Sequence, residues 1–156
     1  MTKITNISVK DVKKLREETG AGVMDARKSL IEADGNSTKA KEILKIKGTE
    51  TVAKKVDRVT PQGLVETYVH AGGKVGAMVY LACETDFVAK TDEFKILAKE
   101  LSMQVAAMNP KDTDVLLKQE YIRDPGKTVK QLVGETIAKT GENVQIKRIT
   151  RFALGE

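Results

Sequence analysis

Residues 64–81 read LVETYVHAGGKVGAMVYL, two β-rich runs on either side of a Gly-Gly pair. Gly72 and Gly73 supply the positive φ values that a tight primed turn requires, so the stretch predicts an antiparallel hairpin. Apolar residues fall on both faces of the second run, 75–81, which indicates an inner strand of a sheet. The hairpin therefore predicts a small antiparallel sheet in this part of the chain.

Helices are predicted directly after this hairpin. Thr91 is an N-cap for a long helix that ends at Asn109-Pro110, and its core stripe is spaced at three and four residues. That stripe consists of Phe94, Leu97, Ala98, Leu101, Val105 and Met108. The following segment, 111–123, is polar and is expected to be the least ordered part of the chain.

The C-terminal part returns to regular structure. Asp124-Pro125-Gly126 predicts a plain turn, and Thr128 caps a helix that stops at Gly141. Residues 144–152 then predict a strand. The order of hairpin, two helices and strand indicates an α+β core over 63–156.

The N-terminal residues predict three short helices. The first runs from Val9 to Thr19, the second begins after Gly22, and the third begins at Ser37 and is expected to end at Gly48. They predict a three-helix module over 1–50. A linker is expected over 51–62, because it ends in the helix-breaking run Thr60-Pro61-Gln62-Gly63.

Composition limits the class of protein. The 156 residues carry a net charge of +5, distributed as +5 over 1–60, −3 over 61–120 and +3 over 121–156. Aromatic residues make up 4% of the chain, which is a poor basis for stacking on RNA, so charge alone leaves an acidic protein partner and RNA as alternatives. One cysteine, no signal peptide and no membrane-spanning apolar run predict a soluble protein of the reducing cytoplasm or an organelle interior.

Few residues suit catalysis or cofactor binding. Cys83 and His70 are the only candidates for a nucleophile and a base, and no third group orients them at a recognisable spacing. A cysteine that ends an apolar strand is usually a small core residue. The chain has no Gly-rich phosphate loop and no paired metal ligands, so neither an enzyme nor a bound cofactor or metal is expected.

Three patterns in the sequence each allow two interpretations. Asp86 and Phe87 follow an apolar strand just before a helix, which favours either presentation to a partner or a Phe87 that folds back into the core. Met24, Lys28 and Ile31 share a second face of the second helix, which is either an exposed contact patch or the site of a flexible, gap-filling Met24. The basic strand 145–152 could follow RNA phosphates, but a solvated outer face is the better interpretation.

Two segments resemble the signature motifs of the translation elongation factor Ts family. They read LREETGAGVMD over residues 15–25 and CETDFVAK over residues 83–90. The likeness extends through 141–143 and the terminal residues 151–156, so it covers nearly the whole chain as a short form of the family.

The resemblance implies a non-enzymatic guanine nucleotide exchange factor that promotes GDP release from elongation factor Tu during translation elongation. It also implies that the N-terminal module is similar to ubiquitin-associated domains and docks on the nucleotide-binding domain of that GTPase. Arg16, Val23 and Met24 match the positions implicated in this docking.

The resemblance of the second motif implies which residues act on the partner, and these residues, 85–88, are called the working tip. By resemblance, Asp86 and Phe87 enter the nucleotide-binding domain of the partner near its nucleotide site and displace Mg²⁺, with Thr85 and Val88 as their supports. No direct contact with nucleic acid and none with a membrane is expected.

The chain departs from the family pattern at three places, of which the mildest is Ala26 and Arg27, where Cys and Lys are common. Tyr80 and Ala82 stand where the family commonly has Glu and Asn, in the strand that leads to the motif. The region between Pro110 and Tyr121 is shorter than in the family, and the duplicated core of longer members is absent. Short members pair two chains in place of that duplication, so a homodimer is an open alternative here.

Overall fold

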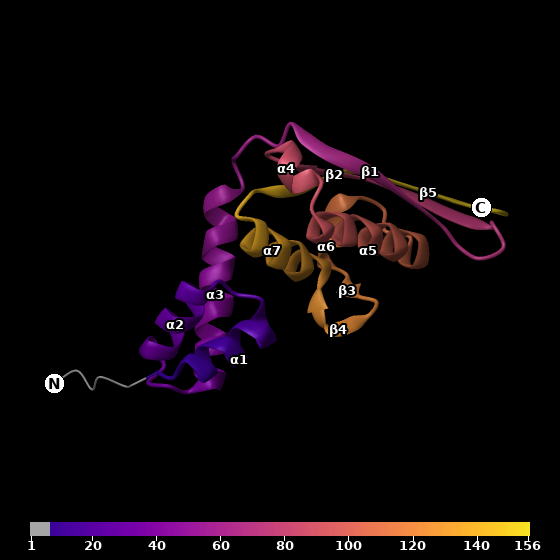
Figure 1. Ribbon diagram of the computed structural model, residues 1–156. Coiled ribbons are helices and arrows are strands. Elements are labelled where there is room, and N and C mark those ends of the chain that lie inside the picture. Colours follow the sequence, from indigo (N-terminus) through magenta and orange to yellow (C-terminus); the bar gives the residue numbers. More distant parts are fainter. Residues whose placement is uncertain (1–6) are drawn as a thin grey trace. The chain divides into compact units, whose positions relative to one another are not determined.

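The computed structural model describes residues 7–156, which form two compact units that divide between Lys54 and Lys55 (Figure 1). The first unit is helical and the second combines a sheet with helices, so the predicted α+β class is confirmed. Over 7–156, no helix has the length and apolar character needed to cross a membrane.

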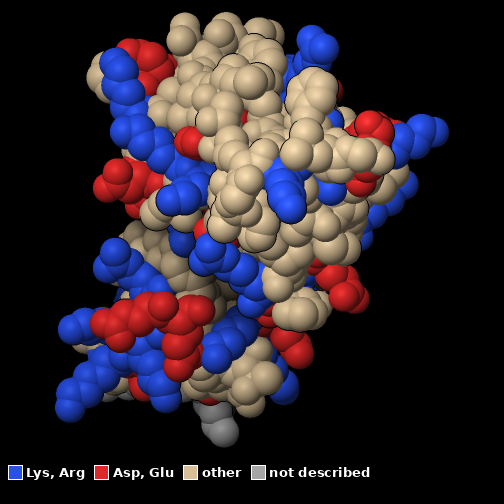
Figure 2. All heavy atoms as spheres, turned by 90° about the vertical axis from the view of Figure 1, so that its right-hand side faces the viewer, with Lys and Arg blue, Asp and Glu red and all other residues tan. Residues whose placement is uncertain are grey.

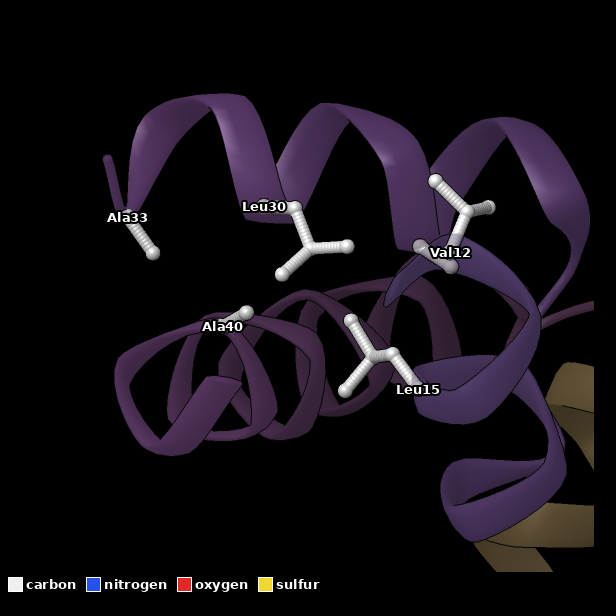
Figure 3. Close-up of a cluster of buried hydrophobic side chains, with 6 residues drawn as sticks. Val12, Leu15, Leu30, Ala33 and Ala40 are labelled. Carbon is white, nitrogen blue, oxygen red and sulfur yellow. The ribbon is translucent and has the colours of Figure 1, made fainter. Parts of the chain in front are cut away.

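The first unit is built from α1 (Val9–Thr19), α2 (Val23–Glu32) and α3 (Ser37–Lys55). Ser8 caps α1 and Gly20 ends it in the left-handed conformation. Its core is one cluster of buried side chains contributed by all three helices (Figure 3). The members of this cluster are Val12, Leu15, Ala26, Leu30, Ala33 and Ala40.

The helix α3 continues beyond its predicted end. Gly48 ends a helix when it takes a left-handed conformation, but here its φ is not positive and the helix runs on to Lys55. Hydroxyl groups of Thr49 and Thr51 donate to carbonyls one turn earlier. The prediction that the third helix ends at Gly48 is therefore wrong, and the division between the units falls inside the segment predicted as a linker.

The second unit is organised by a three-stranded antiparallel sheet with the order β1-β2-β5. Its strands are β1 (Gln62–Val69), β2 (Val75–Cys83) and β5 (Val144–Ala153). The predicted inner position of β2 is confirmed, and Gly72 and Gly73 have the predicted positive φ values of 87° and 69°. The helix α5 (Asp92–Met108) covers one face of the sheet (Figure 1).

The opposite face of the sheet is open among the described residues. Large apolar side chains from all three strands are exposed there, namely Val65, Val69, Met78, Tyr80 and Phe152. Figure 2 shows that residues other than Lys, Arg, Asp and Glu gather over the upper part of the view, at the height that the sheet has in Figure 1. Antiparallel sheets tolerate one open face, but that face is normally polar. The exposed apolar side chains on this face are therefore unusual and require an explanation.

The segment expected to be least ordered is regular, so that prediction is wrong. It contains α6 (Thr113–Lys118) and the strand β3 (Glu120–Tyr121), which pairs with β4 (Asp124–Thr128). The buried side chain of Gln104 on α5 holds this hairpin, because it donates to the carbonyl of Glu120 and accepts from the N–H of Ile122. The turn predicted at 124–126 is part of β4, and α7 (Val129–Thr140) follows with its predicted caps.

Candidate functional site

The motif residues form a one-turn helix, α4 (Asp86–Ala89), directly after β2. Thr85 is its N-cap, and the hydroxyl oxygen of Thr85 accepts a hydrogen bond from the N–H of Val88 at 3.4 Å. Val88 is buried, whereas the side chain of Phe87 is 79% exposed. The interpretation of Phe87 as a core residue is therefore wrong, and the aromatic ring projects from a helix that is anchored through Val88.

Asp86, the residue before Phe87, belongs to a charged pair. The carboxylate of Asp86 accepts a hydrogen bond of 2.8 Å from the ammonium group of Lys90, one turn later. This bond and the charge of Lys90 lower the pKa of Asp86 below its ordinary value. The spacing of four residues was a sequence signal for this pair. Asp86 is therefore a carboxylate at neutral pH.

A second carboxylate holds the start of the motif from a distant part of the chain. Glu142 follows α7, and its side chain accepts hydrogen bonds from the N–H of Glu84 at 3.1 Å and the N–H of Thr85 at 3.0 Å. It also accepts a 2.6 Å bond from the hydroxyl of Thr85. One side chain thus takes three donors from the two residues that precede α4.

The neighbouring residues complete a reciprocal contact. The carboxylate of Glu84 accepts from the N–H of Asn143 at 2.7 Å and lies 3.5 Å from the guanidinium of Arg58. The amide group of Asn143 donates to the carbonyls of Val56 and Arg58. Sequence reasoning did not assign any of these roles. The available signals were the position of Glu142-Asn143 between a helix stop and a strand and the family likeness over 141–143, and neither identifies what the side chains contact.

The departures from the family pattern lie in different environments. Tyr80 is on the open face of the sheet, opposite Val65 and Arg148, whereas Ala82 is fully buried. Neither side chain takes part in the hydrogen bonds around α4 described above, which come from Glu142, Glu84 and Asn143 instead.

Cys83 and His70 are not brought together. Cys83 pairs with Gln62 at one end of the hairpin, whereas His70 follows Val69 at the other. Seven residues of strand separate these ends by about 23 Å. The Cys83 thiol is buried, donates to the carbonyl of Thr85, and has its pKa raised to about 11, chiefly by desolvation. A thiol in this state is a poor nucleophile, so the structure does not support the catalytic alternative.

The predicted docking residues lie at the junction of the first two helices. Arg16 is exposed in the last turn of α1, and Val23 and Met24 begin α2, with 51% and 58% of their surfaces exposed. The hydroxyl of Thr19 donates to the carbonyl of Leu15 and supports the tight connection between these helices. The three side chains are therefore accessible to a partner, and the hydrogen bond of Thr19 supports the connection between the helices that carry them.

Two other candidate sites can be described. Arg148 lies on the open face of the sheet, while Arg151 on the opposite face donates to the carbonyl of Ala106 and pairs with Glu156. The basic residues of β5 therefore do not form one continuous stripe for RNA. Over 7–156, no three His, Cys, Asp or Glu side chains are grouped closely enough to hold a metal ion.

Known proteins resemble this chain over most of its length. The family model described as Elongation factor TS matches residues 84–156. A protein from Thermoanaerobacter sp. (strain X514) named Elongation factor Ts is 45% identical and aligns over 96% of each chain. One from Thermotoga sp. (strain RQ2) with the same name is 41% identical, over 96% of this chain and 97% of its own.

The lengths of these relatives differ from that of this chain. The Thermoanaerobacter alignment runs over 195 positions, whereas the chain has 156 residues, so that relative carries residues without a counterpart here. A longer Elongation factor Ts from Nostoc punctiforme is 45% identical over 98% of this chain, which covers 48% of that protein. Similarity at this level over nearly the entire chain shows that it belongs to the elongation factor Ts family, a family of translation elongation factors.

Proposed function

We propose that the chain is a guanine nucleotide exchange factor that promotes GDP release from elongation factor Tu during translation elongation. Family membership supports this partner and this process. The observation that carries the mechanism is the exposed ring of Phe87 on a helix held by Thr85 and Glu142. A large aromatic side chain that is rigidly supported and exposed is suited to entering an apolar cleft of another protein.

The proposed chemistry takes place in the nucleotide site of the partner. Mg²⁺ requires near-ideal octahedral geometry at about 2.0–2.1 Å, so a small displacement of its surroundings weakens its coordination. Insertion of Phe87 between elements of the partner produces such a displacement, and the carboxylate of Asp86 captures polar groups that are moved. Loss of the metal removes charge neutralisation from the phosphates of GDP, which then dissociates faster.

Two exposed regions have separate roles in this proposal. Arg16, Val23 and Met24 provide binding energy on the nucleotide-binding domain of the partner, while α4 acts at the nucleotide site. Because coupling between two ligands is reciprocal, bound nucleotide weakens the affinity of this chain for its partner by the factor by which the chain weakens nucleotide. The complex is therefore tightest without nucleotide and is released when GTP binds.

The test is the rate of GDP release. Elongation factor Tu loaded with a fluorescent GDP analogue is mixed with increasing amounts of the chain, and the maximal release rate is measured. We expect acceleration over the spontaneous rate, and a loss of about tenfold or more on Phe87→Ala, as for removal of an aromatic anchor. Release at the spontaneous rate with saturating wild-type chain would refute the exchange function.

A matched variant separates the tip from the rest of the surface. Ile96 on α5 is also apolar and 61% exposed, so Ile96→Ala removes comparable surface elsewhere in the same unit. It should leave the release rate unchanged. Equal effects of the Ile96 and Phe87 variants would show that the mechanism does not depend on the tip.

We further propose that two copies of the chain pair through the open face of the sheet. Exposed apolar side chains from all three strands lie on this face together with Arg148, and sheets pack face to face at about 10 Å. Met78 lies on the central strand, so Met78→Glu places a charge in the middle of the face. Light scattering should show a dimer for wild type and a monomer for this variant. A monomeric wild-type chain at micromolar concentration would refute the pairing.

A further inference from the structure

The hydrogen bonds of Glu142 converge on the two residues that precede the working tip. Its carboxylate oxygens accept from the N–H of Glu84, the N–H of Thr85 and the hydroxyl of Thr85, at 3.1, 3.0 and 2.6 Å. The same hydroxyl oxygen accepts from the N–H of Val88. Glu142 thus acts on α4 through Thr85, although it lies 57 residues away in the sequence.

A helix of this length depends on such contacts. α4 has four residues, and a helix this short has no independent stability because nucleation is unfavourable. Buried Val88 anchors one side of it, and the thiol of Cys83 and the hydroxyl of Thr91 donate to the carbonyls of Thr85 and Val88. Hydrogen bonds to a charged acceptor are stronger than these neutral ones and directional, so Glu142 adds the strongest polar restraint on the direction of the helix.

The hydrogen bonds between the motif and residues 142–143 run in both directions. Glu84 accepts from the N–H of Asn143, the residue after Glu142, so the two segments exchange hydrogen bonds in both directions. Asn143 also donates to the carbonyls of Val56 and Arg58. Three separate stretches of the chain therefore meet where α4 begins, and Glu142 provides the greatest number of bonds to the motif itself.

We propose that Glu142 is a positioning residue for nucleotide exchange, which fixes the direction in which α4 presents Phe87. This inference rests on the proposed function. Glu142 acts through Thr85 and needs no contact with nucleotide or with Mg²⁺ of the partner. When α4 is free to reorient, only a fraction of bound complexes holds Phe87 in the productive direction, and the maximal release rate falls with that fraction.

The variants differ in how many of these bonds they keep. Glu142→Ala removes the acceptor for all three donors. Glu142→Gln keeps one oxygen for the two N–H groups, and its NH₂ group can donate to the hydroxyl oxygen of Thr85. Glu135→Ala on α7 is the control, because Glu135 pairs with Lys127 at the surface and does not contact the motif.

The first measurement is GDP release from elongation factor Tu as a function of factor concentration. We expect Glu142→Ala to lower the maximal rate by about tenfold or more while the half-saturating concentration changes less, because the docking residues lie in the other unit. Glu142→Gln should recover most of the rate, and Glu135→Ala should match wild type. A wild-type rate for Glu142→Ala would overturn the proposal, as would a pure change in half-saturating concentration.

The second measurement does not depend on the partner. Amide hydrogen exchange in the free chain should be faster for Glu84, Thr85 and Val88 in Glu142→Ala than in wild type, with the sheet amides unchanged. Unchanged protection of these amides would overturn the restraint even if exchange activity were lost. If Glu142→Ala does not fold, Glu142→Asp takes its place, since it keeps the charge but is too short to reach all three donors.

A double variant tests whether Glu142 affects the release rate by positioning Phe87. Added to Phe87→Ala, Glu142→Ala should cause little further loss of release rate, because the ring that it positions is already absent. Fully multiplicative effects would overturn the proposal. If wild-type chain fails to accelerate release at all, the exchange function and the positioning role both fall, whereas the amide result separately decides whether Glu142 holds α4.

Discussion

The two exposed surfaces of the protein are supported in different ways. Phe87 lies on a four-residue helix whose N-cap, Thr85, donates hydrogen bonds to Glu142, distant in the sequence. Val23 and Met24 begin a ten-residue helix whose N-cap, Gly22, makes no side-chain hydrogen bond. The proposed docking surface therefore depends on packing within a small core, and the proposed tip depends on directional polar contacts. A surface that only binds tolerates adjustment, whereas a side chain that must enter a cleft in one orientation requires a defined direction.

The largest effect is expected from the core of the helical unit. Three of the six members of its buried cluster are alanines, so Leu30 is one of few large side chains there. Leu30→Ala should destabilise this unit by about 2–5 kcal/mol, through lost burial and a cavity. Amide exchange should then show loss of protection in α1–α3 while the sheet stays protected, and binding to elongation factor Tu should weaken.

The adjacent residue is the control for that prediction. Ile31→Ala removes a side chain of similar size from the same helix, but one that is 46% exposed, and should cost under about 1 kcal/mol. Simultaneous loss of protection in both units of Leu30→Ala would show that the two units unfold together. The contrast between the two surfaces would then fail, because it assumes that each unit is stabilised by a core of its own.

A comparable effect in the other unit is expected at the start of the sheet. Gly63 has a φ of 148°, and a Cβ placed there would lie 2.1 Å from the carbonyl oxygen of Leu81. Gly63→Ala should therefore destabilise the second unit by at least about 2 kcal/mol in denaturant unfolding. Gly73→Ala is the matched control, since its φ is also positive but no atom lies within 4 Å, and its cost should be about 1 kcal/mol. Equal costs would show that the close approach is relieved without penalty.

A smaller effect of opposite sign is expected within α3. Gly48 has helical geometry, and a Cβ placed there would have no atom within 4 Å, so Gly48→Ala should stabilise the helical unit by about 0.5–1 kcal/mol. Gly141→Ala places the same methyl group at a φ of 76° and should destabilise instead. Thermal unfolding of both variants checks the sign. Destabilisation by Gly48→Ala would mean that α3 requires flexibility at this point.

The smallest effect concerns charge at the tip. Lys90→Met removes the partner that lowers the pKa of Asp86, so that pKa should rise toward its ordinary value in an NMR titration. A lowered folded-state pKa stabilises the protein above the ordinary pKa and ceases to do so as the pH falls through the lowered value. The effect on stability is small because both groups are exposed. Lys95→Met on α5 is the control, and an unchanged pKa in Lys90→Met would show that the pair does not persist in solution.

The sequence predicted local structure well where one signal acts within a few residues. Gly72-Gly73 located the hairpin, and Thr91 and Thr128 located two helix starts that the structure confirms. The prediction that the third helix ends at Gly48 failed because glycine ends a helix only when it takes a left-handed conformation. Gly48 does not take that conformation, and the helix continues through it. The prediction for 111–123 failed for two reasons: its hairpin is held by Gln104, which lies on another helix, and the N-cap Asp112 of α6 was a local signal that was not used.

The amino-acid sequence by itself determined the α+β class, the inner position of β2 and the family, and it singled out the pair Asp86-Phe87 without deciding whether Phe87 is exposed. These follow from periodicity, turn chemistry and motif, which are encoded over short distances. Only the tertiary structure decided what holds that pair in place. The bonds from Glu142 to Thr85 join residues far apart in the chain, and hydrogen bonds of this kind exist only after the strands and helices that carry them have packed.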